Sequence, residues 1–341
     1  MNVRKFNYLD VAKVLTCFLV VIGHVFYRYK LDDWLDWGGH NIYLAQLAAY
    51  IYSFHMPLFF IISGYVYGKQ MNKNIDYSLS NETTFINKKV KRLMVPFFCF
   101  SIPLTAVLYY VGRFQGSILE NYCHTLLLYN DTYLWFLPCL FVISILYNSL
   151  RTFIRKRSYL CLLVFIVLYV ISDYLPSYLS MHNIAHYLIY YHVGAVAQLN
   201  EKQILKLYKA KNIFVFFLLH LIFFYLVMKT WGYIVIHNVL GLGCAMLGSL
   251  LMLTISNLIS NEYILHSKIV GCFIRDSYSV YLIHPMLIYL LYFYIFKNLG
   301  TCYTQFILSI IICYGVSILF AFILRRLNCA WIIGEKNVTY I

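Results

Sequence analysis

The chain has 341 residues, of which 62% are hydrophobic and only 12% are charged, and its formal net charge is +14. This composition excludes an ordinary water-soluble globular protein and predicts a chain that crosses a membrane several times. Apolar runs of about 17 to 25 residues predict spanning helices rather than a β-barrel, whose strands are short and alternate apolar with polar residues.

We therefore predict an all-α, polytopic membrane bundle of about ten transmembrane helices. Cytoplasmic loops carry an excess of Lys and Arg. With both termini cytoplasmic, 21 of the 27 basic residues lie inside, five lie outside, and the remaining one is Lys13. The net charge is thus a topogenic signal, and no nucleic-acid partner is expected. The predicted spans are 11–27, 42–67, 90–111, 133–150, 159–175, 185–199, 213–228, 234–258, 277–296 and 305–324.

The first span contains two ionisable residues, Lys13 and His24, which are eleven positions apart in the sequence. Eleven helical steps make three turns plus about 20°, so both side chains share one face, about 16 Å apart along the axis. Lys13 then stands near the cytoplasmic surface and His24 beyond the midplane. Ionisable groups are costly in lipid, which favours a functional site inside the bundle. The alternatives are a Lys13 that reaches the headgroups and a His24 that bonds a neighbouring helix.

The second span holds His55 and, two residues later, Pro57. Proline frees a backbone carbonyl, so we predict a kink or a cavity-lining break there. His55 is a candidate site residue or a structural histidine. Ser63 lies eight residues further along the same span, although a helical serine more often bonds its own backbone.

A cationic run precedes the third span: Lys88, Lys89, Lys91 and Arg92. It can hold phosphates through charge-assisted hydrogen bonds, or it can anchor the helix to anionic membrane lipid. Trp135 enters the fourth span from outside, where tryptophan is ordinarily an interface anchor. His284 lies in the cytoplasmic half of the ninth predicted span.

Several chemistries are disfavoured. No pair of acidic residues falls within the spans, which argues against glycosidase chemistry and against proton-coupled transport. The ten cysteines show no metal-ligand spacing, so no metal site is predicted, although Cys123 and Cys302 fall in outward loops and could pair. In the eighth span, Gly241, Ala245 and Ser249 form a stripe of small residues, which predicts close helix packing.

Together these elements resemble acyltransferase family 3 of integral-membrane acyltransferases, in particular the subset similar to fucose 4-O-acetylases. The family has an arginine ten intervening residues before a histidine, and Lys13 and His24 keep that interval. An ammonium cannot reproduce the bidentate contacts of a guanidinium. The resemblance is carried by residues 8–13 with 20–24, 54–64, 88–96, 134–138 and 278–285.

The resemblance implies one integral-membrane O-acyltransferase domain over residues 1–341, in the cytoplasmic membrane, without an extramembrane catalytic domain. The donor would be a cytoplasmic acyl-CoA, most often acetyl-CoA, as co-substrate, with no permanently bound cofactor. The acceptor would be a hydroxyl of a cell-surface glycan or its lipid-linked precursor. We expect His24, as general base or acyl relay, and Lys13 to be catalytic. Donor binding is expected from Lys88, Lys89, Lys91, Arg92 and His284, the last near the donor's entrance, and substrate binding from His55, Ser63 and Trp135.

Two other functions fit the same spans. A transporter of polysaccharide or lipid-linked sugar also needs a polar cavity with aromatic sugar contacts. A non-catalytic scaffold in a polysaccharide-assembly complex would need no donor site at all. Acyl transfer alone predicts that glycans gain acyl groups and that loss of His24 abolishes the gain.

Overall fold

The computed structural model describes residues 7–27, 42–71, 79–127, 133–260, 268–296 and 303–336. These residues are almost entirely helical and contain no strand, which confirms the predicted all-α fold. The elements are α1 (Tyr8–Tyr27), α2 (Ile42–Tyr52), α3 (His55–Met71), α4 (Leu79–Lys89), η1 (Val90–Met94), α5 (Val95–Tyr110), α6 (Ile118–Leu126), α7 (Phe136–Ser149), α8 (Arg151–Lys156), α9 (Ser158–Val170), η2 (Ser172–Tyr174), η3 (Tyr178–Ser180), α10 (Met181–Leu199), α11 (Glu201–Ile204), α12 (Ala210–Lys229), α13 (Ile234–Ile259), α14 (Lys268–Leu291), η5 (Tyr292–Phe296), α15 (Tyr303–Arg326) and η6 (Ala330–Ile333).

Each predicted span falls largely on helical residues, and the second falls on two helices, α2 and α3. Seven helical segments of the described residues are long and apolar enough to cross a membrane: Tyr8–Tyr27, Ile42–Met71, Glu82–Tyr110, Ala210–Lys229, Ile234–Ile259, Val270–Phe296 and Thr304–Arg326. The other three predicted spans fall on the shorter apolar helices α7 and α9 and on α10. The protein is therefore a multi-pass membrane protein, while the count of ten and the side of the termini stay predictions.

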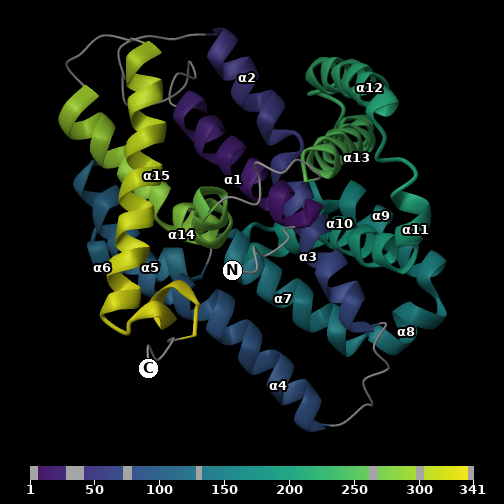
Figure 1. Ribbon diagram of the computed structural model, residues 1–341, viewed down its shortest axis with the longest axis horizontal. Coiled ribbons are helices and arrows are strands. Elements are labelled where there is room, and N and C mark those ends of the chain that lie inside the picture. The colour runs from purple at the N-terminus through teal and green to yellow at the C-terminus, as the bar shows by residue number, and fades with distance from the viewer. Residues whose placement is uncertain are drawn as a thin grey trace.

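Helix α1 lies inside the bundle, where it packs against α2, α3, α13, α14 and α15. Figure 1 shows α1 within this group, and α12 beyond α13 at the edge of the molecule. The start of α1 is fixed by a capping arrangement: the Asp10 amide donates to Asn7 Oδ1 at 3.0 Å, and the Asn7 amide donates to Asp10 Oδ2 at 3.3 Å. Lys13 and His24 therefore lie on a helix that other helices contact on several sides.

The second predicted span is broken, as Pro57 indicated. Helix α2 ends at Tyr52 and α3 begins at His55, with a turn at Ser53 and Phe54. Pro57 lies in the first turn of α3, where a backbone donor would have no partner within the helix, so the ring is accommodated without loss of a hydrogen bond. The break turns Tyr52 toward α1 and lets His55 start a new helix.

Two glycines allow α3 and α10 to touch through their backbones. A Cβ at Gly64 would overlap the carbonyl oxygen of Tyr191, and a Cβ at Gly194 would overlap that of Ile61. Small residues permit such close crossings of membrane helices. The crossing holds α3, and with it His55 and Ser63, at a fixed place in the bundle.

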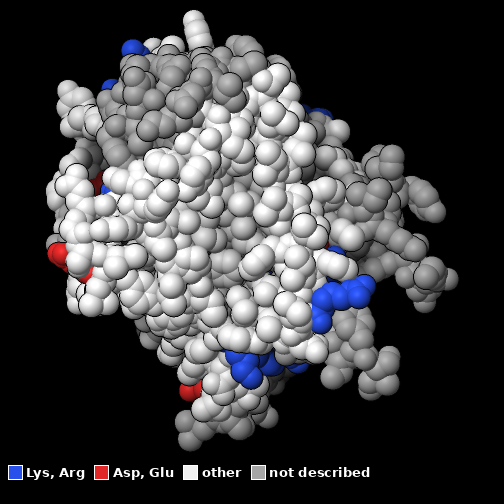
Figure 2. Space-filling model, turned by 90° about the vertical axis from the view of Figure 1, so that its left-hand side faces the viewer, with Lys and Arg blue, Asp and Glu red and all other residues white. Residues whose placement is uncertain are grey.

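Charge is unevenly distributed over the surface. Figure 2 shows a broad face with few charged side chains, and most of the Lys and Arg atoms visible on it lie toward its lower edge. The helix ends that carry Lys13, Lys89, Arg92, Arg275 and Arg325 meet at one end of the bundle, called the basic face below. An uncharged belt bounded by a basic rim is the surface expected of a membrane protein.

Candidate functional site

A cavity of about 350 Å³ lies at the basic face, between α1, α3, η1, α7 and α14. Four cations line this inner cavity, Lys13, Lys89, Arg92 and Arg275, together with a single carboxylate, that of Asp10. Its other walls are largely apolar. A cavity with a cationic rim and an apolar interior suits a ligand with a charged head and an apolar arm.

Lys13 faces this cavity from α1. Its Nζ lies 3.7 Å from Asp10 Oδ1, so the two residues form an ion pair at i,i+3. One turn deeper, Cys17 also lines the cavity, and its thiol donates to the Ser277 carbonyl oxygen at 3.1 Å. That bond joins α1 to α14, so the two walls of the cavity are fastened together beside Lys13.

The predicted cationic run divides into two pairs. Lys89 and Arg92 line the inner cavity, whereas Lys88 and Lys91 are exposed and do not line it. Residues three apart on a helix share a face, which explains why alternate members of the run point the same way. Only half of the predicted donor-binding run therefore borders the cavity.

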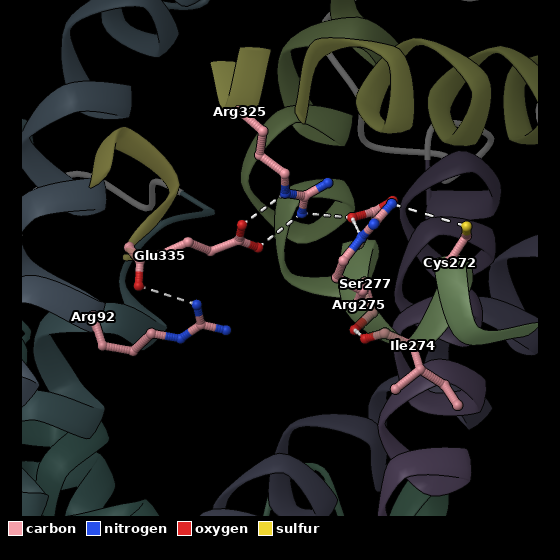
Figure 3. Close-up of polar contacts among 9 residues, drawn as sticks. Arg92, Cys272, Ile274, Arg275, Ser277, Arg325 and Glu335 are labelled. Atoms are coloured by element: carbon pink, nitrogen blue, oxygen red, sulfur yellow. Dashed lines mark hydrogen bonds and ion pairs between the residues drawn. The ribbon is translucent and has the colours of Figure 1, made fainter. Parts of the chain in front are cut away.

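Arg92 is held in place by aromatic and backbone contacts. Its guanidinium lies 4.2 Å from the centre of the Tyr278 ring, and its Nη1 donates to the Gly334 carbonyl oxygen at 3.2 Å (Figure 3). The Tyr278 hydroxyl donates to the Arg92 carbonyl oxygen at 2.7 Å. Gly334 has φ of +68°, and a Cβ there would lie 2.8 Å from the Arg92 carbonyl oxygen, so this position needs glycine.

Gly334 belongs to the C-terminal strap, residues 330–335, which is anchored by an ion-pair network beside the cavity (Figure 3). Arg325 donates from Nε to Glu335 Oε2 at 2.7 Å and from Nη2 to Asp276 Oδ1 at 2.6 Å. Arg275 donates to the two oxygens of Asp276 at 2.9 and 3.0 Å. The Asp276 side chain is only 1% exposed, and its charge is compensated by two guanidiniums.

Deeper in the bundle, three histidines from three helices gather around tyrosines. The centres of the His24 and His284 rings are 5.2 Å apart. Tyr52 links His24 to the third histidine, His55: its hydroxyl lies 2.8 Å from His24 Nδ1, and its ring centre lies 4.9 Å from that of His55. Tyr133 packs edge-on against His24 at 4.5 Å between ring centres. No group of His, Cys, Asp or Glu side chains in the described part of the chain is arranged to hold a metal ion.

The histidines of this cluster differ in their hydrogen bonds. His55 and His284 are both buried, and each places Nδ1 2.9 Å from the carbonyl oxygen four residues earlier in its own helix. The Nε2 atom of His284 is buried without a hydrogen-bond partner among the described residues. His24 is half-buried and uses Nδ1 for a side-chain partner instead. Of the three, His24 is the member whose Nδ1 contacts a side chain from another helix rather than a carbonyl of its own helix.

His284 lies deeper than its sequence suggested. Helix α14 begins at Lys268, nine residues before the predicted span, so His284 comes sixteen residues after the helix start, just as His24 comes sixteen residues after Tyr8. Two helices that start at the same face bring such residues to the same depth. His284 consequently sits beside His24 and does not line the inner cavity, in contrast to its expected place at the donor's entrance.

The three residues predicted to bind substrate are dispersed. Ser63 lines the inner cavity, on the basic side of the histidine cluster. His55 belongs to the cluster itself. The Trp135 ring packs against Phe60 and against Tyr187, whose ring centre is 5.1 Å away. Trp135 does not line the inner cavity and does not lie next to His24. No common binding site brings these three side chains together.

Sequence reasoning missed the tyrosines that connect the cavity to the histidines. Tyr281 lines the inner cavity, its hydroxyl donates to the Tyr133 carbonyl oxygen at 2.8 Å, and its ring centre lies 6.1 Å from that of His284. Tyr52 and Tyr281 each precede a histidine by three residues, a spacing that places Tyr281 and His284 on one side of α14, whereas the turn after α2 separates Tyr52 from His55. Among so many tyrosines that spacing was the only available signal. Cys302, suggested as a partner of Cys123, lies outside the described residues.

The chain matches one known protein family over most of its length. Residues 6–326 match a family model described as an acyltransferase domain, Acyl_transf_3. Comparisons with curated proteins and with solved structures give no match. The narrower resemblance to fucose 4-O-acetylases stays a prediction. Because this match covers nearly the whole chain, the protein belongs to the acyltransferase 3 family.

Proposed function

We propose that this acyltransferase moves an acyl group, most often acetyl, from a cytoplasmic acyl-CoA to a hydroxyl of a cell-surface glycan or its lipid-linked precursor. The main support is the position of Tyr281, which lines the cationic inner cavity. Its hydroxyl bonds the Tyr133 carbonyl oxygen, and the Tyr133 ring packs against His24. A donor bound in the cavity can therefore direct its thioester toward His24.

The charge of the inner cavity supports acyl-CoA as the donor. Lys89, Arg92 and Arg275 can pair with the phosphates of the nucleotide at the basic face. Apolar side chains such as Phe59 and Phe136 line the rest of the cavity and suit the uncharged arm of the donor. Lys13 lies between these regions, and its ammonium is positioned to meet a polar group of the arm.

His24 would act as the general base on the acceptor hydroxyl. The hydroxyl oxygen bonds the thioester carbonyl carbon, the carbon–sulfur bond breaks, and His24 passes the proton it took to the departing CoA sulfur. For Nε2 to accept that proton, Nδ1 must carry its own and donate to Tyr52 Oη, which lies 2.8 Å away. Tyr52 is therefore a positioning residue that fixes the tautomer of His24.

A covalent relay is the second route to the same product. In it one imidazole nitrogen of His24 attacks the thioester carbonyl carbon, the carbon–sulfur bond breaks, and the ring gives its proton to the departing CoA sulfur. The acceptor oxygen then takes the acyl group from the imidazole, and the proton of its hydroxyl returns to the ring. Purified protein incubated with radiolabelled acetyl-CoA and no acceptor separates the two routes. Label bound to the wild-type protein and absent from His24→Ala indicates the relay, and no bound label indicates direct transfer.

The function is tested by mass spectrometry of surface glycans from cells with and without the protein. Glycans should gain acetyl groups only when the protein is present, and His24→Ala should abolish the gain while the protein still inserts. His124→Ala is the matched control, because this histidine on α6 lines neither cavity described for the chain. Unchanged acetylation by His24→Ala would refute the assignment of His24, and movement of labelled glycan without any acyl donor would favour transport.

A further inference from the structure

A second cavity, of about 170 Å³, lies among α9, α10, α13 and the turn between α2 and α3. This outer cavity shares no lining residue with the inner one. Tyr52 forms part of its wall, and the same side chain contacts His24 Nδ1 at 2.8 Å. The outer cavity therefore reaches the histidine cluster from a direction different from that of the inner cavity.

The outer cavity is formed by the helix ends that point away from the basic face. Tyr169 lies twelve residues after Arg157, which puts it about 18 Å along the axis of α9 from that basic residue. His186 lies in the first turns of α10, whose other end leads toward Lys202, and His237 lies in the first turn of α13. The cavity thus stands on the side of the bundle opposite to the inner cavity.

Its lining is aromatic, with polar tips. Among the described residues it includes four tyrosines and two histidines but no Asp, Glu, Lys or Arg. The buried Tyr190 hydroxyl lies near that of Tyr169 in this lining, so a ligand hydroxyl there can bond both. Aromatic rings with polar tips can pack against the faces of a sugar ring and bond its hydroxyls. No described lining residue offers a counter-charge to an anionic or cationic ligand, and the carboxylate of Asp173, close to His186, already contacts Asn238 and His182.

Small residues on α13 provide the space. Gly241 and Ala245 line the cavity, and a Cβ at Gly241 would lie 3.2 Å from the Tyr169 hydroxyl. These are two of the three residues whose spacing suggested a helix-packing stripe. The close approach of α13 to α12 instead uses Gly243, where a Cβ would overlap the Phe223 ring. The small size of Gly241 and Ala245 thus keeps the cavity open.

We propose that the outer cavity is the acceptor site and that it binds a neutral sugar ring, whose hydroxyl passes Tyr52 to reach His24. This inference rests on the proposed function, since it names the acceptor of the same reaction. It assigns the two cavities opposite chemistries: a cationic one for the phosphates of the donor and an uncharged aromatic one for the acceptor. Because none of the described residues that line the outer cavity is an Asp, Glu, Lys or Arg, the site should prefer a neutral sugar to a charged one.

A space-filling variant tests the proposal. Gly241→Leu should fill the outer cavity and raise KM for the acceptor by at least about tenfold, while the affinity for acetyl-CoA stays unchanged. Gly315→Leu is the matched control, because this glycine of α15 is also helical and has open space around its Cβ direction. Ala245→Phe provides a second variant that fills the same space from the next helical turn.

Binding is measured separately from transfer. Saturation-transfer NMR on the protein in nanodiscs uses neutral methyl hexosides, with glucosamine and glucuronate as charged analogues. Binding of the neutral sugars that Gly241→Leu abolishes and Gly315→Leu retains supports the site, even if no acyl transfer is found, in which case only the proposed function fails. If transfer occurs and Gly241→Leu leaves the acceptor KM unchanged, the site is refuted and the function stands. Equal or tighter binding of the charged analogues, or no sugar binding and no transfer by the wild type, also overturns the proposal.

Discussion

Arg325 donates to Asp276 at 2.6 Å and so joins the end of α15 to α14, next to Arg275 in the wall of the inner cavity. Asp276 is buried, and Arg325 is only 12% exposed, so water screens this pair little. The pair also ties the C-terminal strap to the cavity, because Arg325 bonds Glu335 as well.

Asp276→Asn should destabilise the protein, because it leaves Arg325 buried with less compensating charge. We expect a loss of about 3 kcal/mol, seen as a lower melting temperature of the detergent-solubilised protein. Glu335→Gln is the control, since Glu335 is more exposed, and it should cost much less. Equal melting of Asp276→Asn and the wild type would show that the pair contributes nothing.

Gly334→Ala should weaken donor binding without altering the chemical step. Alanine in the left-handed conformation costs about 1 to 2 kcal/mol, and its Cβ would press on the Arg92 carbonyl oxygen, so the strap should release Arg92. We expect KM for acetyl-CoA to rise severalfold with kcat nearly unchanged. Gly232→Ala, where a Cβ meets nothing within 4 Å, should behave as the wild type. A fall in kcat alone would contradict this role of the strap.

Removal of one pair from the cationic run should differ from removal of the other. Lys89→Ala with Arg92→Ala takes two cations from the inner cavity and should raise KM for acetyl-CoA by about tenfold or more. Lys88→Ala with Lys91→Ala removes the same charge from exposed positions and should leave KM nearly unchanged. The two double variants change the topogenic charge equally, so insertion is matched. Equal effects on KM would mean that the run acts only through its total charge.

Tyr52→Phe should lower kcat by about tenfold or more, though less than His24→Ala, because His24 loses the partner that fixes its tautomer. The chain offers a matched control on the same helix: Tyr50, whose hydroxyl lies 2.9 Å from His220 Nδ1. Tyr50→Phe breaks a similar tyrosine–histidine contact and should leave kcat near that of the wild type. If both variants lose the same activity, the effect is structural and the positioning role of Tyr52 is wrong.

The sequence predicted those features that depend on apolar length and helical period. The predicted spans became helices, Lys13 and His24 lie on the inward side of α1, and Pro57 marks a break. These follow from local chemistry. The first residues of α14, 268–276, were left out of the predicted span because Arg275 and Asp276 interrupt the apolar run. A hydropathy pattern cannot tell that these two residues are paired with each other rather than solvated.

The contacts that build the site depend on how distant helices meet. Tyr52, Tyr281 and Arg275 are near His24 or Lys13 only because α2, α14 and α1 pack together, and no local pattern distinguishes them from other tyrosines and arginines of the chain. The stripe of Gly241 and Ala245 had two possible roles, contact with a neighbouring helix or an open space, and only the position of Tyr169 decides between them.

The two cavities remain separate volumes, and rings of the chain stand between them: Tyr281 borders one, Tyr52 borders the other, and Tyr133 and His24 lie in the middle. Among the described residues, these rings separate the two volumes. Under the proposed reaction only the acyl group would cross this aromatic septum, while the donor and the acceptor each stay in their own cavity, so a membrane containing the protein would keep its electrochemical gradients.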